Sequence, residues 1–284
     1  MKTLSLFKLT DEQQTLNTLT EDLLTQYKFT PCGKHDALRM GFTENIVDGM
    51  FVSDVMGYVV VTVKEQTKKP KKYSVDQLVE EKSANHENLF GKSPTKGEVK
   101  SFAIEAREEL LPNTEPDEPK VYTVAFRKKD GLVLVEANYK KAESLLALLR
   151  KTLGSLPVIP LETDTPVTDF MDEAVGKSLS DTLTLGSKGK FVGEDMVHSL
   201  SKGSLYDDHA KDLIKDGFLA EDIQMEYEGI ITFSLKADLL LDGLKFDKEL
   251  FATEDGESDE AGNFVLKLTE VNKLVDDLLS RLEG

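Results

Sequence analysis

The chain has 284 residues, with 35 basic and 52 acidic side chains, a formal net charge of −17, one cysteine and no tryptophan. A single cysteine excludes both a disulfide framework and a cysteine-based zinc cluster. Apolar runs such as Tyr58–Val61 are far short of the ~20 residues that cross a bilayer. The N-terminal residues also lack the apolar stretch of a secretion signal, so we expect a cytoplasmic protein without a membrane partner.

The negative charge is confined to the second half of the chain. Residues 1–151 hold 23 basic and 23 acidic side chains, whereas residues 152–284 hold 12 basic and 29 acidic ones. The total argues against a nucleic-acid partner, because phosphate contacts come from Lys and Arg, but a local positive surface can exist within a negative total. Taken alone, the basic clusters of the first half are better explained as solvated ends of strands and helices.

The first 120 residues predict three helices and one buried strand. A capping box and leucines at helical spacing predict a helix over Thr10–Tyr27. A β-branched run predicts a strand over Gly57–Val63. Capping signals begin two more helices at Ser74 and Ser93, and a proline ends the second of them at Leu111.

A hairpin and a helix follow. The strands Lys120–Phe126 and Leu132–Ala137 flank an Asp-Gly turn, which is a hairpin signal. A leucine stripe predicts a helix over Tyr139–Leu153, closed by a glycine. Lys140 and Lys151 fall on a different face of this helix from the leucines.

The acidic second half mixes helical and extended patterns, so the whole chain is predicted to be α+β. The predicted elements are helices over Val167–Ala174, Asp181–Leu185, Leu205–Asp216 and Thr269–Leu282, a strand over Gly229–Lys236, an extended stretch over Phe264–Leu268 and an exposed acidic loop over Glu254–Gly262.

No pattern in the sequence predicts a catalytic residue, a metal ligand or a cofactor. Gly91-Lys92-Ser93 ends like a phosphate-binding loop, but His86 stands where its first glycine belongs. The acidic loop has Glu260 at the sixth position of a calcium loop, where glycine is required. Cys32 has no second cysteine to pair with, and we interpret it as a packed apolar side chain.

Three segments together resemble the RdgC family of recombination-associated proteins. They are Phe29–Gly33 with the nearby Met40–Phe42, the long block Leu145–Leu161, and Leu244–Leu250. The resemblance implies a non-enzymatic protein of the bacterial cytoplasm and nucleoid that binds double-stranded DNA with little sequence preference. It further implies a horseshoe-shaped subunit that pairs into a ring-shaped homodimer around DNA and restrains the RecA recombinase.

The same resemblance divides the chain into regions. Residues 1–63 and 121–161 would form a central antiparallel sheet region, residues 64–120 a helical tip and residues 162–284 an acidic base region. A DNA-contacting finger of the family falls at Ser201–Gly203, where Lys202 keeps the basic character and Gly203 replaces a polar residue. In the family a basic-aromatic stretch closes the ring between tips, and here the acidic Asn113–Pro119, without an aromatic residue, replaces it.

The candidate DNA contacts are therefore basic residues from four clusters and the finger. They are Lys68, Lys69, Lys71, Lys72, Arg127, Lys128, Lys129, Lys140, Arg150, Lys151 and Lys202. The alternative is an acidic interaction module that binds a basic partner or mimics DNA. The net charge, Gly203 and the acidic Asn113–Pro119 favour this alternative. An enzyme whose site no motif reveals is the least favoured hypothesis.

Overall fold

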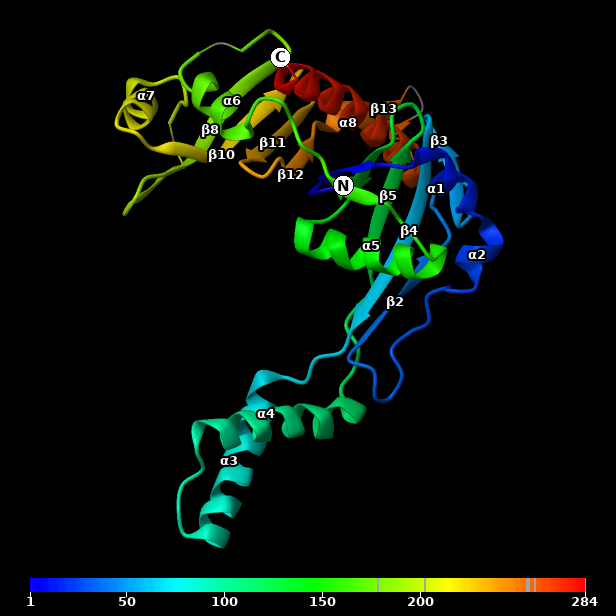
Figure 1. Ribbon diagram of the computed structural model, residues 1–284, viewed down its shortest axis with the longest axis vertical. Helices are drawn as coiled ribbons and strands as arrows, with labels where there is room; N and C mark the ends of the chain where they lie inside the picture. The colour runs from blue at the N-terminus through cyan, green and yellow to red at the C-terminus, as the bar shows by residue number, and fades with distance from the viewer. Residues whose placement is uncertain (178, 202, 254–255, 258, 284) are drawn as a thin grey trace. The chain divides into compact units, whose positions relative to one another are not determined.

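A computed structural model describes residues 1–177, 179–201, 203–253, 256–257 and 259–283 (Figure 1). Helices and antiparallel sheets are mixed along the chain, which confirms the predicted α+β class. The chain divides into two compact units. The first comprises Met1–Leu24, Glu44–Thr62 and Thr123–Gly284, and the second comprises Thr25–Thr43 and Val63–Tyr122. Every helix in the described ranges is too short or too polar to cross a bilayer.

An antiparallel sheet organises the N-terminal part of the first unit. Strand β1 (Ser5–Leu9) pairs with β6 (Leu132–Val135) on one side and with the edge strand β7 (Val158–Pro160) on the other. Strand β6 forms the predicted hairpin with β5 (Lys120–Arg127). Next to β5 in the sheet lies β4 (Tyr58–Thr67), to which β3 (Val52–Val55) is also paired.

Helix α5 (Tyr139–Leu153) covers one face of this sheet and has the predicted bounds. Asn138 caps its start by accepting a hydrogen bond from the Lys141 amide at 3.0 Å, and a left-handed glycine ends it. The Tyr139 ring meets Phe7 of β1 edge to face, with ring centres 5.5 Å apart. The leucine stripe is buried, so the hydrophobic contact fixes which side of α5 faces solvent.

The opposite face of the sheet packs against the C-terminal half of the chain. There a second sheet has the strand order β12-β11-β10-β8-β9. Its strands are β8 (Leu183–Val192), β9 (Val197–Leu200), β10 (Leu219–Tyr227), β11 (Ile231–Lys236) and β12 (Leu241–Phe246). Leu6 and Leu134 of the first sheet share one buried core with Ile223 of β10 and Leu274 of the last helix.

Three helices complete the first unit's C-terminal half. They are α6 (Val167–Ala174), α7 (Asp208–Lys215) and α8 (Glu260–Leu282), and a short strand pair, β13 (Ala252–Thr253) with β14 (Gly256–Glu257), precedes α8. The structure confirms the predicted bounds of α6.

Three predictions of the type or continuity of an element were wrong. The predicted helix over Thr10–Tyr27 is two short helices, α1 (Glu12–Thr18) and α2 (Glu21–Thr25), because Asp11 rather than Thr10 caps the first and Leu19 turns extended. Leu183 and Leu185, predicted helical, lie in β8, where pairing with β10 stabilises alternate burial. Phe264–Leu268 is helical, because Asp259 caps α8 well before it.

The predicted acidic loop Glu254–Gly262 is only partly correct. Its last residues, from Glu260, already belong to α8. Glu254, Asp255 and Ser258 lie outside the described residues, so the rest of that prediction stays untested.

The second unit combines β2 (Leu38–Thr43), which pairs with β4, with two long helices. These are α3 (Lys72–Phe90) and α4 (Lys96–Leu110), followed by the short 3₁₀ turn η1 (Leu111–Asn113). Thr95, not Ser93, caps α4, in a reciprocal capping box with Glu98. Lys82 of α3 joins the helices by reaching Glu105 and Glu109 of α4, each at 3.2 Å.

Candidate nucleic-acid interface

The solvent side of α5 carries three of the predicted DNA contacts. Lys140, Arg150 and Lys151 are all exposed, and their side chains make no ion pair with any residue that the structure describes. Lys140 and Lys151 lie within about 20° of each other around the helix axis and about 16 Å apart along it. We call these three residues the α5 basic face. Its charges are free to meet a phosphate backbone.

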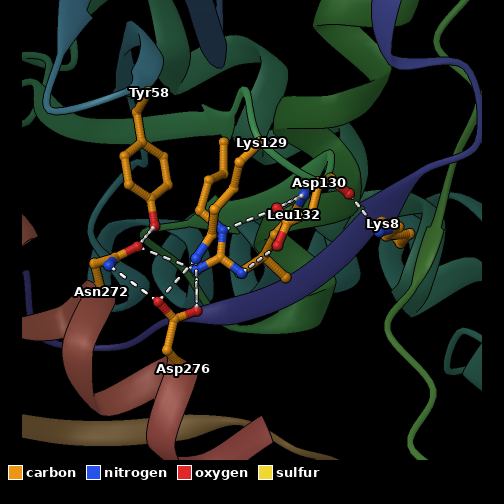
Figure 2. A network of polar contacts seen from close by, with 8 residues as sticks. Lys8, Tyr58, Lys129, Asp130, Leu132, Asn272 and Asp276 are labelled. Atoms are coloured by element: carbon orange, nitrogen blue, oxygen red, sulfur yellow. Dashed lines mark hydrogen bonds and ion pairs between the residues drawn. The ribbon is translucent and has the colours of Figure 1, made fainter. Parts of the chain in front are cut away.

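The β5–β6 turn carries three further predicted contacts, but their charges are paired inside the protein. The Arg127 side chain is 5% exposed. Its guanidinium donates to both oxygens of Asp130, at 2.9 and 2.6 Å, and to Asp276 of α8 at 2.6 Å. Figure 2 shows Asp130, Asp276 and Asn272 converging on this point. The structure therefore gives Arg127 the role of joining the hairpin to α8.

The two lysines of the turn also pair with carboxylates in or beside this network. Lys129 pairs with Asp276 at 3.0 Å and Lys128 pairs with Asp54. Together with Arg127, three cations meet the three carboxylates of Asp54, Asp130 and Asp276. Such a cluster produces little positive potential toward solvent.

Burial shapes the proton affinities in this network. Burial, opposed by Arg127, raises the pKa of Tyr58 to about 12, and its hydroxyl donates to Asn272 at 2.6 Å (Figure 2). Burial on its own would lower the pKa of Arg127, but the hydrogen bond to Asp130 and the surrounding negative charge raise it instead. Burial acts to raise the pKa of Asp130, whereas its bonds to Arg127 and to the Leu132 amide hold it below the ordinary value. The guanidinium is thus permanently charged.

In the second unit, the Lys68–Lys72 segment divides in the same way. Lys68 is 4% exposed, and its ammonium donates to the carbonyl oxygens of Lys34 at 3.0 Å and of Gly33 at 3.4 Å. Lys69, Lys71 and Lys72 are exposed and make no ion pair within the described residues. We call them the α3 basic start, because they lie where that helix begins.

Two segments singled out by the resemblance have different outcomes. Lys202 lies outside the described residues, so its predicted contact stays a prediction, while Gly203 is exposed. In the acidic Asn113–Pro119 segment, Asp117 accepts a hydrogen bond from the Thr67 hydroxyl and its carbonyl accepts one from Gln66 at 2.9 Å. That part of the segment is therefore held against β4.

The partners of Arg127 are the residues that sequence reasoning missed. Asn272 and Asp276 lie about 150 positions away in the chain, and no local pattern distinguishes them from other polar residues of an amphipathic helix. Across the described ranges, no group of three or more His, Cys, Asp or Glu side chains is placed to hold a metal ion.

Comparison with known proteins decides the family. The family model described as "Putative exonuclease, RdgC" matches residues 1–284, the full length of the sequence. The chain belongs to the RdgC family. Curated relatives named "Recombination-associated protein RdgC" include those of Tolumonas auensis, 26% identical over 93% of this chain and 91% of the relative, and of Aeromonas hydrophila, 27% identical over 98% and 94%. The relative from Colwellia psychrerythraea is 27% identical over 92% of this chain and 89% of its own length.

The two kinds of description differ on activity. The RdgC family model names an exonuclease, whereas the names of the relatives refer to recombination and to no reaction. A direct test for strand degradation is therefore part of any functional assay of this chain.

Proposed function

We propose that this protein binds double-stranded DNA without reading its sequence and acts in DNA recombination. The α5 basic face carries the proposal, because its three cations are exposed and unpaired within the described residues. Lysine and arginine contacts to phosphates give affinity without sequence information. The names of the relatives supply the link to recombination.

The charge distribution supports contact through a restricted surface. Residues 152–284 hold 12 basic and 29 acidic side chains. Their negative field repels DNA from most of the acidic half, so DNA meets the protein where cations are exposed and unpaired. We extend the same reasoning to the α3 basic start, whose three lysines are also exposed.

The proposed assembly follows the family resemblance. Two copies pair into a ring-shaped homodimer with duplex DNA in its hole, and occupancy of the DNA restrains RecA at the nucleoid. Each subunit consists of a central sheet region, a helical tip and an acidic base region with the boundaries given above. The protein needs no cofactor for this function, since binding rests on charge alone.

The experiment compares two double charge reversals of equal net charge. Fluorescence anisotropy measures binding to several unrelated 40-base-pair duplexes between 50 and 200 mM salt. Arg150→Glu with Lys151→Glu removes two phosphate contacts, so the slope of log affinity against log salt falls by about 1.8 for every sequence. The matched control, Lys245→Glu with Lys248→Glu, alters two exposed lysines of the acidic half and leaves the slope unchanged.

Three results contradict the proposal. Absence of binding at 50 mM salt, where electrostatic affinity is strongest, excludes DNA as the ligand. Equal losses in both double variants show that total charge acts rather than the α5 basic face. Shortening of end-labelled duplex by the purified protein with Mg²⁺ reveals an exonuclease and overturns the non-enzymatic role. Light scattering tests the homodimer independently.

A further inference from the structure

The second unit contains a cavity of about 530 Å³ where α3 begins and α4 ends. Its apolar lining consists of Ala37, Pro70, Val75 and Leu111. Six charged residues complete it, namely Lys68, Lys69, Lys72, Asp76, Arg107 and Glu108. A concave apolar surface with a few charged groups at its edge is the usual form of a binding site.

The charge at this cavity is positive, unlike that of the whole chain. Lys69, Lys72 and Arg107 are exposed and make no ion pair among the described residues. The Lys68 ammonium donates to two backbone carbonyls, so that side chain lines the cavity with its aliphatic stem. Four cations and two carboxylates thus line one cavity in a chain of net charge −17.

The start of α3 also favours an anion at this cavity. Its N-cap residue, Lys71, makes no side-chain capping bond, and no acidic residue occupies the first turn. Lysines at the positive end of a helix dipole are unfavourably placed, and free amide groups there favour an anion. Lys72 and Val75 belong both to this turn and to the cavity lining.

We propose that the cavity binds a bulky apolar side chain carried on an acidic peptide segment of a partner protein. The apolar side chain fills the space between Val75 and Leu111, while flanking carboxylates meet Lys69, Lys72 and Arg107. An unpaired nucleotide fits the lining less well, because bases in such sites stack on aromatic side chains and none lines this cavity. The proposal is independent of DNA binding by α5, but a peptide bound here competes with DNA for Lys69 and Lys72 of the α3 basic start.

The probe is a fluorescein-labelled peptide of four aspartates followed by leucine and phenylalanine, titrated with the full-length protein and followed by anisotropy. We expect saturable binding, seen as a rise in anisotropy with protein concentration. Arg107→Glu weakens binding at least tenfold. The matched control Lys100→Glu makes the same charge change on the exposed side of α4, outside the cavity lining, and alters binding less than twofold.

A second variant separates the cavity from the charge. Ala37→Trp fills the space from an exposed position that tolerates a large side chain, and it abolishes peptide binding while the circular dichroism spectrum stays unchanged. Equal binding of a peptide with serine in place of leucine and phenylalanine overturns the proposal, since charge alone then explains the contact. Displacement of the peptide by a 12-residue oligothymidylate from wild type, but not retention by the Ala37→Trp variant, assigns the cavity to a nucleotide and also overturns it.

Discussion

Truncation of Arg127 tests whether its charge holds the first unit together. Arg127→Ala removes the donor that Asp130 and Asp276 share, in a side chain that is 5% exposed. Breaking a buried ion pair costs about 3–5 kcal/mol. The two carboxylates are 36% and 38% exposed and rehydrate after the truncation, so we expect the lower limit, about 3 kcal/mol. With a urea dependence of about 2–3 kcal/mol per molar, the unfolding midpoint falls by about 1 M or more.

Urea unfolding followed by far-ultraviolet circular dichroism measures this midpoint, and hydrogen exchange of α8 locates the loss. The matched control is Lys128→Ala, which removes the adjacent but exposed pair with Asp54 and costs less than about 1 kcal/mol. Midpoints that agree within error for the two variants refute the reasoning. Arg127→Ala also tests the predicted DNA contact. If Arg127 binds a phosphate, its removal lowers the slope of log DNA affinity against log salt by about 0.9. If Arg127 pairs only within the protein, the slope is unchanged.

Three further predictions concern stability. Asp242 accepts hydrogen bonds from Lys236 at 2.8 Å and from Thr3 at 2.7 Å, and these bonds hold its pKa below 3.8. The ionised carboxylate therefore stabilises the fold above pH 3.8, and this stabilisation is lost as the pH falls below that value. Asp242→Asn therefore lowers the free energy of unfolding by about 1 kcal/mol at pH 7, after allowance for solvent screening. Urea titrations should show the difference in free energy of unfolding between wild type and variant becoming smaller below pH 3.8. A difference that does not change with pH contradicts this prediction. Thr95→Ala removes the α4 cap and lowers the free energy of unfolding by about 1 kcal/mol. The loss is measured as faster hydrogen exchange in α4, and unchanged exchange contradicts the prediction. Met56 is exposed with φ of +50°, so Met56→Gly raises the melting temperature by about 2 °C, and a decrease shows that the turn is unstrained.

Elements whose signals are local were predictable. The helix over Tyr139–Leu153 has a complete leucine stripe, a preceding cap residue and a terminal glycine. All of these signals lie in the helix or directly next to it in the sequence. The β5–β6 hairpin likewise depends on its own Asp-Gly turn. In contrast, the first residues of β8, Leu183–Leu185, are predicted to be helical, because it is the pairing with β10 that makes this segment a strand.

The candidate site was predictable only in part, for the same reason. Lys140 and Lys151 are placed on one face by helix periodicity, which the sequence contains. Whether a cation is free depends on carboxylates elsewhere in the chain, such as Asp276 opposite Arg127, and no spacing rule relates the two positions. Lys68 shows the same limit, since backbone carbonyls around residue 34 bind its ammonium.

Clusters of basic residues along a sequence are therefore a poor measure of the field that DNA meets. Arg127, Lys128 and Lys129 form the longest uninterrupted basic run of the sequence, yet each of them pairs with a carboxylate. The α5 basic face is spread over twelve positions and is the weaker pattern in one dimension, but none of its charges is paired within the described residues. Because binding without sequence preference depends on unpaired cations near phosphates, the sparse face is the stronger candidate for the DNA contact.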